Sequence, residues 1–216
     1  MSDPLTVPEA SEAERATLAG FGVSRETIER LEAYAALLVR WQARINLVGP
    51  DTVPALWRRH LIDSAQLWPH LPAGARRLVD LGSGAGFPGL VLAILGAPDV
   101  HLVESDARKG AFLREAARVT ATPVTILSRR IEQIPSLGAD VITARALAPL
   151  PRLLEWAVPH LAPGGQCLFL KGRGAEDELT AAAKDWKIGH RRIPSLTDPD
   201  GAILQLREVR SGPDQP

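Results

Sequence analysis

Four glycines crowd into one short stretch of this chain, directly after an apolar run: Gly82, Gly84, Gly86 and Gly89. Glycines in such a loop let the backbone turn sharply and approach a ligand closely. About twenty residues further on, a second apolar run ends in Glu104, an acid at a strand end that is placed to bind ribose hydroxyls. The spacing predicts a site for a cofactor that contains adenosine.

The loop fits two cofactor motifs. From Gly84 it matches the G-x-G-x-x-G pattern of nicotinamide-dependent oxidoreductases, and from Gly82 it is G-x-G-x-G with Asp80 just before it. The second arrangement resembles the first motif of class I methyltransferases. A pyrophosphate favours backbone N–H groups without a nearby acid, whereas S-adenosylmethionine has no phosphate and carries two cationic groups. Asp80 therefore favours S-adenosylmethionine; NAD, or a loop that only makes a tight turn, are the alternatives.

Ligands in an open α/β sheet bind beyond the carboxyl ends of the strands, and further polar residues stand at the expected ends. Ile131 and Glu132 are placed to flank adenine, unless they form one turn of surface helix. Arg145 and Lys171 each follow an apolar run. Such cations suit an anionic substrate such as an RNA phosphate, or a guanine edge. The alternative is that they form ion pairs with the acids named above.

His60, Asp63 and Ser64 fall on one helix face at positions i, i+3 and i+4. Together with Lys171, we take His60 and Asp63 as candidate catalytic residues that help to hold the target of the reaction. A solvated or capping cluster is the alternative interpretation.

The elements that must position these residues alternate between strand and helix after a break near Pro72. Strands are expected at 76–81, 99–104, 123–128, 139–144, 165–171, 186–192 and 202–209. Helices are expected at 87–96, 107–120, 149–161 and 175–184. This order predicts an α/β fold, a Rossmann-like, seven-stranded, mostly parallel sheet whose last two strands form a hairpin with one antiparallel strand.

An N-terminal helical extension precedes the sheet. We expect a disordered tail at 1–8 and a short helix at 9–19. A long helix capped by Ser24 should stop near Gly49, and a further helix capped by Asp51 or Thr52 should follow. The predicted division is a helical region at 1–73 and a methyltransferase domain at 74–216.

The composition narrows the class of protein. The 216 residues carry 25 basic and 25 acidic side chains and one cysteine, Cys167. The single cysteine and the absence of a signal peptide or a long apolar run favour a cytoplasmic protein without a membrane span. No Cys/His cluster has metal-ligand spacing. Because nucleic-acid binders are usually basic, RNA contact at zero net charge requires a local patch or a substrate presented by a larger particle.

Several stretches together resemble the RsmG (GidB) family, whose members methylate N7 of a guanosine in bacterial 16S rRNA. The matching stretches are Trp41, Asn46–Val48, His60–Ser64, Asp80–Gly89, Val103–Ser105, Lys109, Phe112–Leu113, Arg145–Ala146 and Leu170–Gly172. The resemblance implies contacts with the methyl donor at Gly82, Phe87, Glu104, Ile131, Glu132 and Arg145.

It also implies a 16S rRNA substrate. We expect this substrate in the small ribosomal subunit or an assembly intermediate, and we expect the enzyme to be a monomer. Guanine N7 has a free lone pair and no proton, so its methylation needs positioning and electrostatics rather than a base. A methyltransferase acting on another RNA or on a small molecule is the remaining alternative of the same fold.

Overall fold

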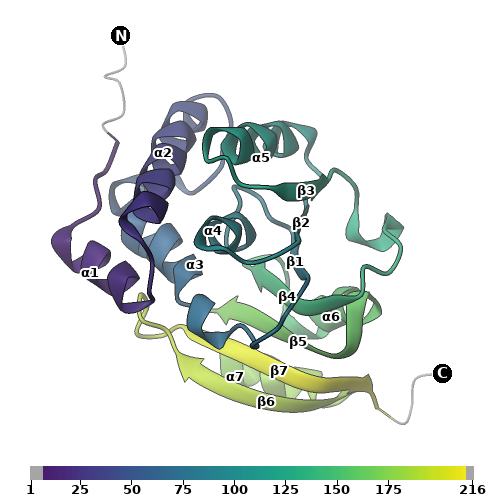
Figure 1. Ribbon diagram of the computed structural model, residues 1–216. Coiled ribbons are helices and arrows are strands. Elements are labelled where there is room, and N and C mark those ends of the chain that lie inside the picture. The colour runs from purple at the N-terminus through teal and green to yellow at the C-terminus, as the bar shows by residue number, and fades with distance from the viewer. Residues whose placement is uncertain (1–6, 213–216) are drawn as a thin grey trace.

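The computed structural model describes residues 7–212 and contains one seven-stranded sheet in the order β3-β2-β1-β4-β5-β7-β6 (Figure 1). The strands are β1 (Leu78–Leu81), β2 (Val100–Val103), β3 (Val124–Leu127), β4 (Ala139–Arg145), β5 (Leu161–Lys171), β6 (Trp186–Pro194) and β7 (Ala202–Ser211). Pairing is parallel from β3 to β5, while β7 runs antiparallel to both β5 and β6. The prediction of a seven-stranded sheet with one antiparallel strand is confirmed.

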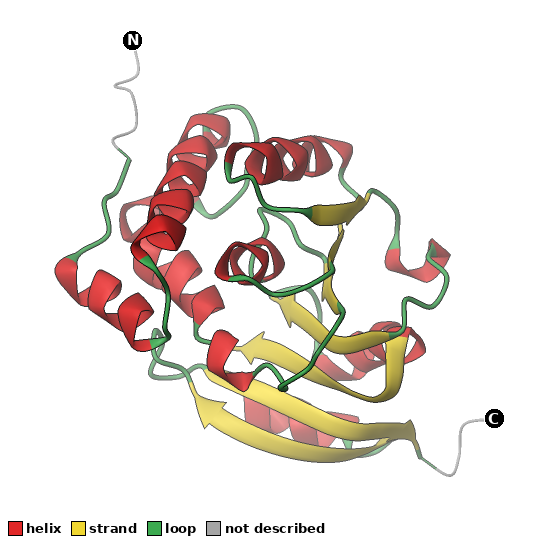
Figure 2. Cartoon of the chain, viewed as in Figure 1, coloured by secondary structure: helices red, strands yellow, loops and turns green. Residues whose placement is uncertain are grey.

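Helices cover both faces of the sheet (Figure 2). The longer ones are α1 (Glu12–Gly20), α2 (Arg25–Gln42), α4 (Gly89–Leu95), α5 (Ala107–Val119), α6 (Leu150–Ala157) and α7 (Ala175–Ala182). Side chains alternate along each strand: Leu102 joins a core with α2, α4 and α5, whereas Val103 joins a core with α6 and α7. The central strands β1, β2 and β4 are buried on both faces, as in other parallel sheets, whereas the edge strands β3 and β6 are partly exposed.

The N-terminal helices share the first of these cores, since Leu31 and Leu38 of α2 are buried in the same cluster as α4 and α5. Ser24 caps α2 as expected, accepting a hydrogen bond from the Thr27 N–H at 3.2 Å. The helix ends at Gln42, earlier than expected, because the Gln42 side chain binds the backbone of Leu47 and Val48 and turns the chain. The division of the chain at residue 73 stays a prediction.

The prediction of a single helix capped by Asp51 or Thr52 is wrong. The chain instead forms four short segments: η1 (Pro50–Ala55), the π-helical turn η2 (Trp57–Ile62), α3 (Asp63–Ala65) and η3 (Trp68–His70). Pro54 lacks the N–H that a regular helix needs, and the Thr52 hydroxyl donates to the Gly49 carbonyl instead of capping a helix. π-Helical turns are frequent at functional sites, and this one carries His60.

Two more bounds differ by four residues from the sequence-based expectation. Helix α6 ends at Ala157, since Pro159 lies in a separate turn, η5 (Val158–His160). Strand β5 starts four residues early because Leu161 pairs with Ala139. The expected tail at 1–8 falls mostly outside the described residues. Between residues 7 and 212, no helix is both long and apolar enough to cross a bilayer.

Candidate functional site

The glycine loop follows β1 and has the backbone that its composition predicts. Gly82 and Gly86 have φ angles of 66° and 98°, in the left-handed region. A Cβ on Gly82 would lie 2.5 Å from the Leu147 side chain, and one on Gly86 would lie 2.8 Å from the Leu90 Cβ. A larger residue at Gly86 would therefore clash with Leu90, and one at Gly82 would strain the backbone and displace the Leu147 side chain.

Glu104, at the end of β2, holds this loop with its carboxylate. One oxygen accepts the Gly84 N–H at 2.8 Å, and the other accepts the Asp106 N–H at 2.7 Å. The carboxylate also lines a cavity of about 340 Å³ beyond the ends of β1, β2 and β4. Each oxygen keeps a lone pair for a ligand in that cavity.

The predicted adenine-flanking residues border the same cavity. Ile131 and Glu132 lie in the turn η4 (Ile131–Gln133) and line the cavity together with Gly82 and Glu104. The indole N–H of Trp156 donates to Glu132 at 3.0 Å and forms a further part of the wall. Gly84 lines the cavity too, whereas Gly86 and Phe87 do not.

Asp80 lies beneath the loop and does not line either cavity of the site. Its side chain is fully buried and accepts the Thr143 hydroxyl at 2.6 Å. Burial raises the pKa of this carboxyl from 3.8 to about 6. A Cβ on Gly89 would lie 2.4 Å from the Asp80 Cβ, so the fourth glycine lets α4 start directly over the acid. The predicted contact between Asp80 and a cofactor stays a prediction.

The hydrogen bonds of the loop test which cofactor fits. Four loop amides already donate within the protein: Ser83 to Val103, Gly84 to Glu104, and both Gly86 and Phe87 to Ser83. A pyrophosphate requires such amides to be free. Their engagement fits S-adenosylmethionine, which has no phosphate, and disfavours a dinucleotide.

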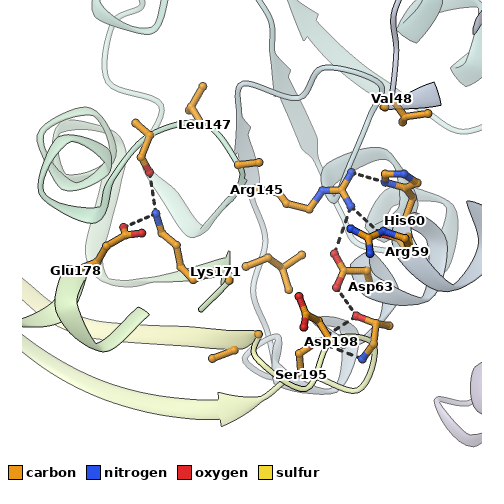
Figure 3. A pocket seen from close by; sticks show the side chains of 18 of the residues that line it. Val48, Arg59, His60, Asp63, Arg145, Leu147, Lys171, Glu178, Ser195 and Asp198 are labelled. Atoms are coloured by element: carbon orange, nitrogen blue, oxygen red, sulfur yellow. Dashed lines mark hydrogen bonds and ion pairs between the residues drawn. The ribbon is translucent and has the colours of Figure 1, made fainter. Parts of the chain in front are cut away.

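A larger cavity of about 630 Å³ adjoins the first. Figure 3 shows side chains that line the larger cavity. Three consecutive residues, Arg145, Ala146 and Leu147, line both cavities and form a shared wall. Ala146 has a φ of 49°, a costly conformation for a residue other than glycine. Strain of this kind persists only where the surroundings fix it.

Arg145 is fixed by the π-helical turn and by α3. Its Nη1 donates to the Arg59 carbonyl at 3.1 Å and to Asp63 at 3.3 Å, and its Nη2 donates to the His60 Nδ1 at 2.9 Å. The guanidinium also lies 4.8 Å from the Phe87 ring centroid. A guanidinium has five N–H donors, so among the described residues the Nε–H and one Nη2–H remain for a ligand.

His60 is held in one neutral tautomer. Because arginine has no acceptor, the His60 Nδ1 must accept, and Nε2–H therefore donates to the Thr52 hydroxyl at 2.7 Å. Burial, then the positive charges of Arg145 and Arg59, lower the His60 pKa from 6.5 to about 3. The imidazole also stacks on Phe87, with 5.1 Å between centroids.

Asp63 joins Arg145 to the loop between β6 and β7. Its Oδ1 accepts the Thr197 hydroxyl at 2.6 Å and the Gln66 amide at 2.9 Å, while its Oδ2 faces Arg145. The same Gln66 accepts the Leu196 N–H at 2.8 Å. Thr197 lies 134 residues from Asp63 along the chain, and no local pattern identifies it.

Lys171 supports the shared wall from the opposite side. The Nζ donates to the Ala148 carbonyl and contacts Glu178 on α7, both at 2.7 Å, and the side chain is largely buried. Glu178 also accepts the Leu150 N–H at 2.6 Å. The structure thus brings His60, Asp63 and Lys171 to one cavity, although the ion pairs of Arg145 and Lys171 go to Asp63 and Glu178 rather than to Asp80 or Glu104.

Comparison with known proteins identifies the relatives of this chain. The family model of GidB, described as rRNA small subunit methyltransferase G, matches residues 27–203. The chain belongs to this family. A ribosomal RNA small subunit methyltransferase G from Paramagnetospirillum magneticum (strain ATCC 700264 / AMB-1) is 75% identical over 195 residues, covering 90% of this chain and 95% of the relative. The same enzyme from Rhodospirillum centenum is 59% identical, covering 88% of each chain.

Solved structures share the fold of this rRNA small subunit methyltransferase G family member at low sequence identity. A SAM-dependent methyltransferase from Aquifex aeolicus has a TM-score of 0.55 at 14% identity and covers 72% of this chain and 93% of that one. M. jannaschii TYW2, in complex with AdoMet, has a TM-score of 0.54 at 13% identity, covering 77% and 78%. Family and fold confirm the predicted class I, S-adenosylmethionine-dependent rRNA methyltransferase and decide against the nicotinamide alternative.

Proposed function

We propose that this member of the family transfers a methyl group from S-adenosylmethionine to N7 of a guanosine in 16S rRNA. The methyl donor would occupy the smaller cavity and the target nucleotide the larger one. The observation that carries the proposal is the wall that both cavities share, Arg145–Leu147. Because the same three residues line both cavities, a donor in one and a nucleotide in the other are neighbours, and direct transfer requires that the methyl group and N7 meet where the cavities adjoin.

The residues of the smaller cavity have complementary roles toward the donor. Glu104 offers acceptors to ribose hydroxyls, and Ile131 and Glu132 flank the base. Gly82 and Gly84 allow close approach of the backbone. When bound, the donor supplies a methyl group on a positively charged sulfur. Phe87 does not line the smaller cavity. Its ring supports the site by packing against both His60 and Arg145.

The site favours a reaction that needs no base. The lone pair of His60 is taken by Arg145, and with a pKa of about 3 the ring does not collect protons at neutral pH. Cys167 is fully buried in β5, and burial raises its thiol pKa, which disfavours a cysteine nucleophile. N7 of guanine fits these conditions because it attacks without losing a proton.

We therefore propose positioning roles for the three candidate catalytic residues. His60 and Asp63 hold the Arg145 guanidinium, which keeps two N–H donors at the junction of the cavities. Lys171 fixes the loop that follows Arg145 through the Ala148 carbonyl. Arg145 itself would touch the donor, the target nucleotide or both.

We further propose that the enzyme is a cytoplasmic monomer that acts on the small subunit or an assembly intermediate rather than on free rRNA. The zero net charge supports this, because weak general attraction to RNA makes a preformed particle the better substrate. In this proposal the helices that precede β1, within the predicted region 1–73, cap the methyltransferase domain predicted at 74–216, and η2 supplies part of the substrate platform.

The test is methyl transfer from radiolabelled S-adenosylmethionine to small subunits from cells that lack the protein, with already modified subunits and free rRNA as controls. We expect label only in unmodified subunits, at a position where chemistry specific for N7-methylguanosine cleaves the rRNA. Label that resists this cleavage would overturn the N7 assignment. Equal rates on free rRNA would overturn the preference for the particle, and label confined to other RNAs or small molecules would overturn the substrate.

A further inference from the structure

A third cavity, of about 360 Å³, lies where α2 ends and α5 begins. It is lined by Arg44, Ile45, Asn46, Asp106, Arg108 and Lys109, and we call it the basic cavity. It is separate from the wall that divides the other two cavities. None of the roles proposed above for the site residues involves it.

The cavity carries an excess of positive charge. Arg44 and Lys109 have no ion-pair partner among the described residues, and Arg108 reaches Asp106 only at 3.8 Å. Asp106 is occupied as the cap of α5, where its Oδ1 accepts the Arg108 and Lys109 N–H groups at 2.8 and 3.2 Å. Three cations therefore face one acid that is already hydrogen-bonded. In a chain with equal numbers of acids and bases, this imbalance is local.

The position of the basic cavity connects it to the site. Lys109 lines both the basic cavity and the smaller cavity. The residues that directly follow Asn46 in the chain, Leu47 to Gly49, line the larger cavity. A polymer whose target unit occupies the larger cavity can therefore place a neighbouring unit at Arg44 and Arg108 by running along the segment 44–49.

We propose that the basic cavity binds a backbone phosphodiester of the RNA substrate, next to the target nucleotide. This inference rests on the proposed rRNA substrate and adds a second contact point to it. Guanidinium groups bind phosphate oxygens through paired N–H donors, and such contacts fix the register of the strand without reading its sequence. The α5 amides are consumed by Asp106, so the side chains supply the donors.

The test uses the double variant Arg44→Gln/Arg108→Gln, which keeps a polar side chain at each position and removes two charges. Its control is Arg25→Gln/Arg118→Gln, which removes two charges from exposed positions near the opposite ends of the same helices, α2 and α5. Binding of full-length protein to unmodified small subunits is measured at several salt concentrations. Affinity for S-adenosylmethionine is measured separately.

We expect the Arg44/Arg108 variant to bind subunits about tenfold more weakly than the control variant. The slope of log affinity against log salt should fall by about 0.7 for each phosphate that the variant no longer neutralises. An affinity and slope equal to those of the control would overturn the proposal, as would a defect confined to S-adenosylmethionine binding. Methyl transfer by the unaltered enzyme tests the proposed function independently. Failure of the phosphodiester site is therefore distinguishable from failure of the proposed function.

Discussion

The Tyr34 hydroxyl, in the middle of α2, donates a hydrogen bond to the carbonyl oxygen of Ala85, at the centre of the glycine loop. Both residues are buried, and 51 positions separate them along the chain. The Tyr34 ring also packs against Phe87 and Phe112, with 5.6 and 6.2 Å between centroids. The N-terminal helices therefore hold the glycine loop, whose Gly82 and Gly84 line the smaller cavity.

Substitution of Tyr34 by Phe should destabilise the protein and weaken donor binding together. The variant keeps the ring but leaves the buried Ala85 carbonyl without this donor, at a cost of about 1–3 kcal/mol in the free energy of unfolding. Chemical denaturation and calorimetric titration with S-adenosylmethionine measure the two effects. Phe112→Leu is the control, since it lowers stability by weaker packing and should change donor affinity less. Unchanged donor affinity in Tyr34→Phe would contradict the role given to this bond.

His60 variants should separate a positioning role from proton transfer. The amide oxygen of His60→Asn can accept from Arg145 much as Nδ1 does, so this variant should retain most activity. His60→Ala leaves Arg145 without that acceptor and should lose about 10- to 100-fold in kcat/KM. The measurement is methyl transfer to unmodified small subunits.

The pH dependence of the rate provides a separate check on His60. With its pKa held near 3, the ring stays neutral from pH 5 to 8 and should contribute no ionisation to the rate profile over that range. The contrary result is a rate that rises with a midpoint near pH 6.5 in the unaltered enzyme and is flat in His60→Asn. It would show that His60 acts as a base.

Much of the site's framework could be predicted because its signals are local. The glycine loop, Glu104 and Arg145 each follow an apolar strand, and a parallel sheet brings such strand ends together. The partners of these residues could not be predicted. Thr52 and Thr197 are ordinary hydroxyl residues, and only tertiary packing brings them to His60 and Asp63. The irregular segment 50–70 could not be predicted either, because the apolar pattern there is helical while Pro54 and the Thr52 hydroxyl favour shorter turns.

Thr197→Val should affect the RNA substrate more than the donor. The change removes the hydroxyl that binds Asp63, while the residue keeps its shape and its place in the larger cavity. Because Asp63 also holds Arg145, we expect a several-fold rise in KM for small subunits, with little change in S-adenosylmethionine affinity. The control is Thr180→Val, on the exposed side of α7 away from both cavities, which should leave both constants unchanged. An equal effect of the two variants would remove Thr197 from the site.

Asp80 should make stability depend on pH. Its pKa is about 6 in the folded protein and 3.8 unfolded, so the folded state binds more protons between these values. The contribution of this group to the free energy of unfolding is up to about 3 kcal/mol. It is fully present below pH 3.8 and is lost as pH rises through 6. Comparison of Asp80→Asn with the unaltered protein by denaturation at pH 4 to 8 should show the difference between them change in that window. A constant difference would contradict the raised pKa.

Lys171→Met should loosen the wall between the cavities. Breaking this largely buried ion pair leaves the Glu178 carboxylate without its cation and should cost about 2–4 kcal/mol of stability. The double variant Lys171→Met/Glu178→Gln removes both charges and should recover part of that stability. Thermal denaturation of Lys171→Met, Glu178→Gln and the double variant measures the coupling. A double variant whose loss of stability equals the sum of the two single losses would show that the two side chains act independently.

The wall of Arg145, Ala146 and Leu147 has a thermodynamic consequence. A ligand in either cavity that displaces the Arg145 guanidinium changes the surface offered to the ligand in the other. The two affinities are then coupled, and linkage makes the coupling reciprocal: the factor by which the donor alters RNA affinity equals the factor by which RNA alters donor affinity. If the two cavities hold the donor and the RNA as proposed, the strained residue Ala146 and the network around Arg145 couple the two binding equilibria.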